Sequence, residues 1–358
     1  MKPDTTIRRG LLHRLGTALS ATSLVLLAGL ASTTAHAEGK LNVYNWGDYI
    51  NPEVLQRFSE KYDVDVSLDT YGSNEEMLAK IQAGATGYDI VFPSVHMHDI
   101  MYKLGLLWKS NINESPRFDN IDPDFLRAKT DPKGEYCLPY AWGTVGIFYN
   151  KDLVPKVESW KDFFEIPEKY DEKIIMLSDM REVISVGLIM NGLSVNTRSM
   201  DDLKVARDFI LERKPDISAF TYDGARSAVL SGDAAAAQWY VGAMMHVQDD
   251  PDTFDYIIPK EGATMYQEDI CVLKSAPHKE NARKFMEFYL QPEIPVLNIK
   301  QQMNGTPNKA AREMLPPRFK NNPAMNPPPE VMDKLQIFED LGNDIRKYDR
   351  VWTQIRTQ

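Results

Sequence analysis

Short apolar segments with the composition of β-strands alternate with helical patterns between residues 41 and 94. Residues 41–44, 64–68 and 89–94 are predicted strands, and the two segments between them carry apolar residues at helical spacing. A strand–helix–strand–helix–strand order predicts a parallel sheet of the α/β class. Ligands of such sheets bind beyond the carboxyl ends of the strands, so side chains that follow these strands are candidates for function.

A second set of strands follows a long strand-like segment at residues 136–149, which is interrupted by glycines. Residues 174–177, 234–239 and 256–258 are its predicted strands, and residues 269–273 are predicted to return to the first set. A chain of this length exceeds what one hydrophobic core usually supports. We therefore expect two lobes joined by crossing strands.

The first 37 residues have the pattern of a secretory signal. Arg8, Arg9 and Arg14 precede a short apolar stretch at residues 15–30, and Ala35-His36-Ala37 is a small-residue cleavage site. The alternative is an N-terminal membrane anchor, but the stretch is short and polar residues interrupt it. We predict export to the periplasm with cleavage after Ala37.

Removing the predicted signal leaves 37 basic and 50 acidic residues, a net charge of −13. This charge argues against nucleic-acid binding, because a phosphate backbone requires the opposite sign. An acidic protein attracts diffusing cations, although acidity also simply improves solubility.

Cys137 and Cys271 are the only cysteines of the chain. Both lie in strand-like segments and could pair in an oxidising compartment. Spacing along the chain does not give the Cα separation that a disulfide requires, so paired and free thiols both remain open.

Trp46, Asp48 and Tyr49 follow the first predicted strand. Flat aromatic faces beside a carboxylate suit an organic cation. The alternative is that the aromatic rings pack within the lobe and that Asp48 forms a turn.

Three further groups occupy similar positions. Asp179 and Glu182, three residues apart at the start of a predicted helix, could bind a cation or interact with the helix dipole. Paired carboxylates also allow a glycosidase interpretation. Trp239 ends an alanine-rich strand, and Asp269 belongs to a Gln-Glu-Asp segment before the return strand.

Motifs for metal binding and catalysis are weak or missing. His96 and His98 would share one face of an extended segment, but zinc usually needs three or four ligands. The sequence contains no G-x-S-x-G, P-loop or G-x-G-x-x-G motif. We therefore predict neither a metal, nor a cofactor, nor an enzyme.

Seven segments form an ordered set across the mature chain: residues 44–49, 71–75, 88–94, 139–143, 179–183, 259–262 and 306–308. With this set the chain resembles the periplasmic polyamine-binding proteins, the spermidine/putrescine receptors of ATP-driven (ABC) importers. The resemblance implies a two-lobed α/β fold of the type II-like periplasmic binding proteins, with crossing strands as a hinge. The implied N-terminal lobe comprises residues 38–143 and 268–313, and the C-terminal lobe comprises residues 144–267 and 314–358.

The resemblance also implies ligand contacts of three kinds. The aromatic walls match Trp46, Tyr49 and Trp239. The acidic partners of ammonium groups match Asp48, Asp179, Glu182 and Asp269. The polar contacts match Ser94 and Gln336. Among these, Asp269 matches the carboxylate that anchors an amine.

The chain departs from the family pattern at three positions where aromatic residues are common. His96, Gln267 and Asn304 occupy these positions, and Tyr266 lies next to Gln267. These four residues are further candidates for ligand contact. Fewer aromatic walls and more amides leave open a different di- or polyamine, or a cationic solute that resembles an amino acid.

The expected function is that of a monomeric transport receptor that passes a polyamine to an ABC permease in the membrane. A sensory protein that reports the polyamine to a membrane signalling receptor is the alternative within the same fold. An enzyme such as a glycosidase is the third class, and it would show turnover.

Overall fold

The computed structural model describes residues 39–47, 49–84, 87–126 and 129–358. The predicted export signal and Asp48 lie outside these residues. Within the described part, no helix combines the length and the apolar character needed to span a bilayer.

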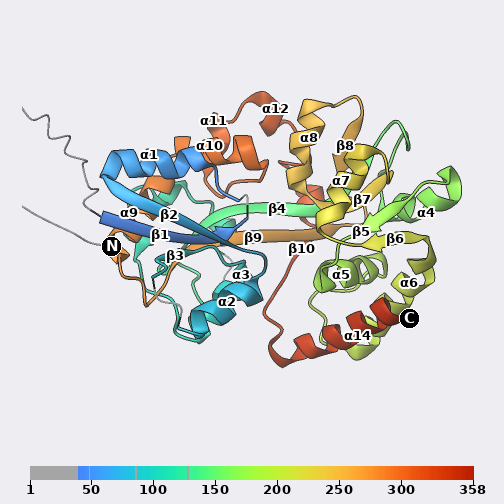
Figure 1. Cartoon of the computed structure of the whole chain (residues 1–358), viewed down its shortest axis with the longest axis horizontal. Coiled ribbons are helices and arrows are strands. Elements are labelled where there is room, and N and C mark those ends of the chain that lie inside the picture. Colours follow the sequence, from blue (N-terminus) through green and yellow to red (C-terminus); the bar gives the residue numbers. More distant parts are fainter. Residues whose placement is uncertain (1–38, 48, 85–86, 127–128) are drawn as a thin grey trace, which may run out of the picture. The chain divides into compact units, whose positions relative to one another are not determined.

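The described strands form one mixed sheet (Figure 1). Their order is β2-β1-β3-β9-β4-β7-β5-β6, with β10 beside β9 and β8 beside β4. The strands are β1 (Gly39–Trp46), β2 (Val64–Tyr71), β3 (Ile90–Val91), β4 (Cys137–Asn150), β5 (Ile174–Met176), β6 (Ile217–Phe220), β7 (Ala236–Tyr240), β8 (Phe254–Ile257), β9 (Ala263–Val272) and β10 (Leu335–Ile337).

The sheet contains two parallel groups that are joined by long antiparallel strands. β1 pairs in parallel with β2 and β3, which confirms the predicted strand–helix–strand order. β5 pairs in parallel with β6 and β7. β4 and β9 run antiparallel to each other, and they connect the first group through β3 and the second through β7 (Figure 1). These two strands are the predicted crossing segments.

The α-helices cover the sheet, and the two that follow β1 and β2 begin at the predicted caps. Asn51 accepts a hydrogen bond from the backbone of Glu53 at 2.9 Å, and Ser73 accepts one from Glu76 at 3.1 Å. The helices are α1 (Pro52–Tyr62), α2 (Asn74–Gln82), α3 (Val95–Lys103), α4 (Trp160–Tyr170), α5 (Met180–Met190), α6 (Met200–Arg213), α7 (Asp223–Ser231), α8 (Met244–Asp249), α9 (Lys279–Tyr289), α10 (Glu293–Gln302), α11 (Lys309–Met314), α12 (Pro317–Lys320), α13 (Pro329–Met332) and α14 (Ile345–Thr357).

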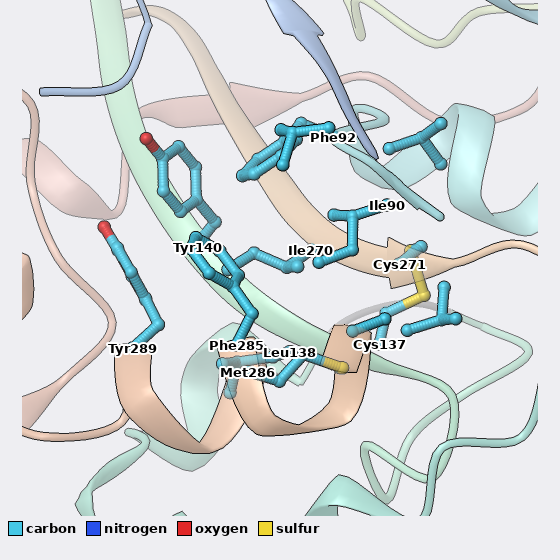
Figure 2. Packing of buried hydrophobic residues seen from close by; sticks show 14 of the residues in the cluster. Ile90, Phe92, Cys137, Leu138, Tyr140, Ile270, Cys271, Phe285, Met286 and Tyr289 are labelled. Carbon is cyan, nitrogen blue, oxygen red and sulfur yellow. A yellow bond between two sulfur atoms is a disulfide. The ribbon is translucent and has the colours of Figure 1, made fainter. Parts of the chain in front are cut away.

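The buried apolar residues divide into clusters on either side of the crossing strands. One cluster takes its residues from 41–141 and 270–294. In Figure 2, Phe92, Tyr140 and Ile270 of this cluster lie close together above α9. Two other clusters contain residues of the chain from Val145 to Tyr256 together with later segments. Because β4 contributes to all three, it links the separate cores.

Cys137 and Cys271 form a disulfide, with their Cα atoms 4.5 Å apart. The register of β4 and β9 explains the pairing, since the two cysteines lie directly opposite each other. The bond joins the two crossing strands inside the first core cluster (Figure 2). The structure thus settles the alternative that the spacing left open.

Candidate ligand-binding site

The site is built along one face of β9. Successive residues of a strand point to opposite faces, so Thr264, Tyr266 and Glu268 share one face. Met265 lies on the other face, where it packs with Phe125 and Trp142 in a small apolar cluster. Polar side chains at both ends of the first face, with an aromatic ring between them, suit an elongated ligand.

Thr264, Tyr266 and Glu268 form a row along this face, which we call the β9 row. Glu268 lies at one end of the β9 row and is 5% exposed. Its carboxylate accepts hydrogen bonds from the hydroxyls of Tyr49 at 2.6 Å and Ser94 at 3.2 Å. Burial raises its pKa to about 8, against the effect of these two hydrogen bonds. Within the described part of the chain, Glu268 forms no ion pair with a basic side chain. It is a buried acid with neutral partners only.

Two helix starts hold Ser94 against Glu268. Ser94 precedes the first residue of α3 and forms a backbone bridge with Glu268. Asn74, the first residue of α2, donates from its amide nitrogen to the Ser94 hydroxyl at 3.1 Å and accepts from the Ser94 backbone at 3.2 Å. Both predicted contacts, Tyr49 and Ser94, therefore converge on one carboxylate.

Trp46 ends β1 next to this group. Its indole nitrogen donates to the carbonyl of Phe92 at 2.8 Å, and the hydroxyl of Tyr71 donates to the same oxygen at 2.7 Å. The rings of Trp46 and Tyr71 lie 4.7 Å apart. The Trp46 indole is thus held in one orientation by the carbonyl of Phe92, which lies two residues before Ser94.

Glu182, in α5, lies next to Thr264 at the other end of the β9 row and is also 5% exposed. The hydroxyl of Thr264 donates to its carboxylate at 2.5 Å. Burial, with a smaller contribution from the charge of Asp179, raises its pKa to about 8. Asp179 itself caps α5 and accepts from the backbone nitrogens of Arg181 at 2.8 Å and Glu182 at 2.9 Å. Asp179 therefore has the helix-start role that was its alternative interpretation.

Tyr266 lies between the two carboxylates. Burial raises its pKa well above the usual value, and the charges of Glu268 and Glu182 raise it further. A Cβ on Gly143, its partner in β4, would lie 2.2 Å from the Tyr266 hydroxyl, so only glycine leaves room for this ring. The hydroxyl donates to the side-chain oxygen of Asn304 at 2.7 Å.

Aromatic rings extend from Tyr266 toward the end of β7. The ring of Tyr240 lies 5.7 Å from Tyr266 and 5.8 Å from Trp239. Trp239 in turn lies 5.1 Å from Tyr222. Ring faces in this arrangement can cover methylene groups and attract cations.

Gln336 reaches the Thr264 end of the row from β10. It pairs with Thr264 across the two strands, and its side-chain oxygen accepts from the backbone of Val195 at 3.0 Å. The predicted polar contact is therefore placed beside the hydroxyl that bonds Glu182.

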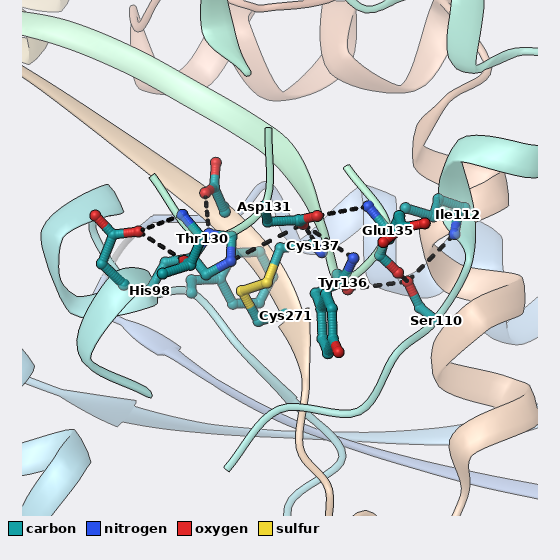
Figure 3. Close-up of a disulfide and its surroundings, with 12 residues drawn as sticks. His98, Ser110, Ile112, Thr130, Asp131, Glu135, Tyr136, Cys137 and Cys271 are labelled. Atoms are coloured by element: carbon teal, nitrogen blue, oxygen red, sulfur yellow. Dashed lines mark hydrogen bonds and ion pairs between the residues drawn. A yellow bond between two sulfur atoms is a disulfide. The ribbon is translucent and has the colours of Figure 1, made fainter. Parts of the chain in front are cut away.

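Asp269, the predicted anchor, lies in a different group of side chains. Its carboxylate bonds the Nδ1 atom of His98 at 2.8 Å and accepts from the amide of Gln267 at 3.1 Å. Figure 3 shows His98 with Asp131 and the disulfide. Because the side-chain period of a strand is two, a shift of one residue moves a carboxylate to the opposite face. The structure brings Glu268, and not Asp269 or Gln267, to Tyr49 and Ser94.

The two histidines do not share a face of an extended segment, because both lie in α3. His96 is half-buried, and burial together with the charge of Arg181 lowers its pKa to about 4, so the ring is neutral at pH 7. In the described residues, the only cluster of three possible metal ligands contains His98, Cys137 and Cys271. Both sulfur atoms of this cluster are in the disulfide, so they offer no thiolate.

Sequence reasoning missed the parts of Thr264, Glu268 and Tyr240 in this arrangement. The alternation of Thr264, Tyr266 and Glu268 is a signal that could have identified the first two. Tyr240 gives no comparable signal, because its approach to Tyr266 depends on the packing of β7 against β4.

Comparison with known proteins agrees with this architecture. The family model of the bacterial extracellular solute-binding proteins matches residues 53–327. The putrescine-binding periplasmic protein SpuD of Pseudomonas aeruginosa is 32% identical over 370 residues, which cover 97% of this chain and 100% of that protein. The spermidine/putrescine-binding periplasmic protein of Escherichia coli is 30% identical over 94% of this chain and 97% of its own length.

Solved structures show the same fold. The substrate-binding protein PotD of a spermidine/putrescine ABC transporter from Streptococcus pneumoniae superposes with a TM-score of 0.80 and 30% identity, over 89% of this chain and 98% of that one. The two-lobed α/β architecture with crossing strands is thereby confirmed. The chain belongs to the family of bacterial extracellular solute-binding proteins, and it is a binding protein rather than an enzyme.

Proposed function

We propose that this protein captures a polyamine of the putrescine or spermidine type in the periplasm and delivers it to an ABC permease. The observation that carries the proposal is the pair of buried acids, Glu268 and Glu182, at the two ends of the β9 row. The names of the relatives support the same ligand class, since they are described as binding putrescine or spermidine.

The physical chemistry of the row favours a ligand with two or more ammonium groups. A buried carboxylate is costly to ionise unless a cation pairs with it. Glu268 and Glu182 bond neutral hydroxyls only, so a ligand ammonium at each end would supply the missing charge. The methylene groups of the ligand would cross the ring of Tyr266 between the two carboxylates.

We assign the roles within this site as follows. Glu268 takes the anchoring role that the family resemblance gave to Asp269, and Glu182 pairs with the distal amine. Trp46 and Tyr49 form walls near Glu268, with Ser94 as a polar contact. The remaining contacts lie toward the Glu182 end: Trp239, Tyr240, Tyr266, Asn304 and Gln336. The predicted roles of Asp48, Asp179 and His96 as direct contacts stay predictions.

We infer lobes of residues 38–143 with 268–313 and of residues 144–267 with 314–358. The separate core clusters support the first boundary, because one ends at Ala141 and another begins at Val145. Ile299 and Met303, which fall in the first of these lobes, pack with the cluster of Val145, so this segment contacts the second lobe. Closure of these lobes would bring Glu182 and Glu268, which belong to different lobes, toward each other.

Titration calorimetry with a panel of amines tests the proposal. The panel contains putrescine, cadaverine, spermidine, spermine, agmatine and the basic amino acids. We expect saturable 1:1 binding of at least one diamine or polyamine. Butylamine, which has a single ammonium group and the same carbon chain as putrescine, is the matched control and should bind much more weakly. Equal affinity for butylamine and putrescine would contradict a site with two acidic ends.

Delivery to a permease is tested separately, in cells. Deleting the protein should abolish uptake of the radiolabelled amine that binds best in vitro, and restoring it should restore uptake. Normal uptake combined with loss of an amine-dependent response would favour the signalling role instead. Mass spectrometry of the exported protein would test cleavage after Ala37, and sedimentation would test the monomeric state.

A further inference from the structure

The pairing of β4 with β9 is irregular directly opposite Glu268. Pro139 pairs with Asp269 and Ala141 pairs with Glu268, so Tyr140 is an extra residue of β4 without a partner in β9. Such a β-bulge changes the direction in which the side chain of the extra residue points. Tyr140 also belongs to one of the segments that carry the family resemblance, and the proposed amine site gives it no role. The register therefore draws attention to where its side chain goes.

The side chain of Tyr140 is fully buried beside the residues that form or support the aromatic walls. Its ring lies 5.7 Å from the ring of Tyr49 and 4.8 Å from the ring of Phe92 (Figure 2). The carbonyl of Phe92 accepts the hydrogen bond of the Trp46 indole. Tyr140 thus contacts one proposed wall residue directly and the support of the other.

The hydroxyl of Tyr140 holds the backbone of Tyr49. It donates a hydrogen bond to the carbonyl oxygen of Tyr49. Burial raises the pKa of Tyr140, so the hydroxyl keeps the proton that it donates. The hydroxyl of Tyr49 in turn donates to Glu268 at 2.6 Å. Because a side chain is held precisely only where its support is held, the position of the Tyr49 hydroxyl depends on Tyr140.

Asn298, in α10, fixes the other partners of this group and is 2% exposed. Its amide nitrogen donates to the Tyr140 hydroxyl at 2.8 Å, and its side-chain oxygen accepts from the backbone of Asn51 at 2.8 Å. The side chain of Asn51 donates to the carbonyl of Leu297 at 3.0 Å. The chain from Tyr49 to Asn51 is therefore bonded to buried groups at both ends, and a connected buried network of this kind favours one geometry.

We propose that Tyr140, held by Asn298, is a positioning residue of the amine site. Its hydroxyl fixes the backbone of Tyr49 so that the Tyr49 hydroxyl reaches Glu268. The inference rests on the proposed function, in which Glu268 pairs with a ligand ammonium group. Without the bond from Tyr49, Glu268 would keep its proton to higher pH and would bind an ammonium group less well.

The sign of this effect follows from the groups around Glu268. The hydrogen bond from Tyr49 lowers the pKa of Glu268, so its loss raises that pKa. Four tyrosine hydroxyls and one carboxylate face Glu268, namely Tyr49, Tyr71, Tyr140, Tyr266 and Asp269. The pKa values of all four tyrosines are raised, so they stay neutral while Glu268 titrates. Asp269 bonds His98, and the variants below leave this pair unchanged.

Carboxyl ¹³C NMR of the ligand-free protein tests the positioning role without a ligand. The signal that disappears in Glu268→Gln identifies Glu268. We expect its pKa to rise by about one unit in Tyr49→Phe, which loses a hydrogen bond to a charged group, and by about half a unit in Tyr140→Phe, which loosens that bond. Tyr149→Phe removes another hydroxyl of β4, which bonds Asp255, and is the matched control that should leave the Glu268 pKa unchanged.

Calorimetry with putrescine at pH 7 measures the consequence for binding. The expected pKa changes correspond to an affinity loss of about threefold in Tyr140→Phe and about tenfold in Tyr49→Phe. In the Tyr49→Phe background, Tyr140→Phe should cause no further loss, since both changes act on the same bond. The ratio of wild-type to variant affinity should also fall as pH rises above the Glu268 pKa, a trend that general loosening of the fold would not produce.

A wild-type Glu268 pKa in Tyr140→Phe would overturn the inference and leave the amine site intact. An undiminished loss of putrescine affinity in the Tyr49→Phe background would also overturn it, because Tyr140 would then act by another route. If the Glu268 pKa rises as expected but putrescine does not bind the wild type, the proposed function fails and the positioning of Glu268 stands. If Tyr140→Phe does not fold, Asn298→Ala replaces it with the same expected results.

Discussion

The two faces of β9 carry buried carboxylates one residue apart, and these carboxylates have opposite surroundings. Glu268 bonds two neutral hydroxyls, and burial raises its pKa to about 8. Asp269 bonds His98. Burial of the His98 ring lowers its pKa, but the hydrogen bond and the charge of Asp269 act in the opposite direction, and on balance the His98 pKa is raised. Asp269 thus bonds an imidazole whose pKa is raised, whereas Glu268 bonds hydroxyl groups only. The comparison teaches that two equally buried carboxylates can differ in their partners, and our proposal places the ligand at the one that bonds only hydroxyl groups.

Glu182→Gln tests whether the second acid belongs to the same functional face as Glu268. We expect diamine affinity to fall by about 2–5 kcal/mol, because one ammonium group would lose its charged partner in a buried site. Calorimetry with putrescine measures the loss. Glu261→Gln, near the start of β9, is the control and should retain affinity. Unchanged binding in Glu182→Gln would place the distal amine elsewhere.

Replacing Cys137 and Cys271 by serine tests whether the face of β9 that carries Asp269 contributes to stability rather than to amine binding. The disulfide closes a loop of 134 residues, and its loss should lower the free energy of unfolding by about 2–5 kcal/mol. Urea denaturation measures this change. Amine affinity should change less than in Glu182→Gln, since the bond lies beside His98 and away from the Glu268 face. A larger loss of affinity than of stability would contradict the separation of the two faces.

The pH dependence of binding follows from the raised pKa values of Glu268 and Glu182. Both carboxyls are partly protonated at pH 7 without ligand, since their pKa values are about 8. Diamine affinity should therefore rise with pH up to about 8, by up to tenfold per unit for each carboxyl below its pKa. Binding should release protons, which calorimetry in buffers of different ionisation enthalpy detects.

The same groups give the ligand-free protein the opposite trend. A carboxyl whose pKa is raised by folding stabilises the folded state below its unfolded pKa and loses this contribution as pH rises through about 8. Thermal unfolding without ligand should thus occur at lower temperature at pH 8 than at pH 6. Diamine affinity that is constant between pH 6 and pH 8 would contradict the proposed protonation of Glu268 and Glu182.

Trp46→Ala has the smallest expected effect. Loss of an aromatic wall should weaken binding by about 1–3 kcal/mol, through lost contact area and cation–π attraction. Calorimetry measures it, with Trp352→Ala on α14 as the control. Wild-type affinity in Trp46→Ala would exclude this residue as a wall.

Local sequence patterns predicted much of the fold. The caps at Asn51 and Ser73 and the parallel order of β1 to β3 follow from residue types and spacing that act over short distances. The long strand predicted at residues 136–149 corresponds to β4, because an almost wholly apolar segment of that length has few alternatives to a buried strand.

The start of β9 was predicted wrongly. The return strand was expected at residues 269–273 but runs from Ala263 to Val272. Gln267, Glu268 and Asp269 interrupt the apolar pattern, since both faces of this buried strand carry polar groups that only tertiary contacts satisfy. The family resemblance gave the anchoring role to Asp269 without knowledge of the strand register, and our proposal moves this role to Glu268.

The direct test of the central claim compares two isosteric variants, Glu268→Gln and Asp269→Asn, by calorimetry with putrescine and spermidine at pH 8. We predict that Glu268→Gln weakens binding by about 2–5 kcal/mol, while Asp269→Asn keeps most of the affinity. Loss of binding in Asp269→Asn with near-normal binding in Glu268→Gln, both variants being folded, would contradict the assignment.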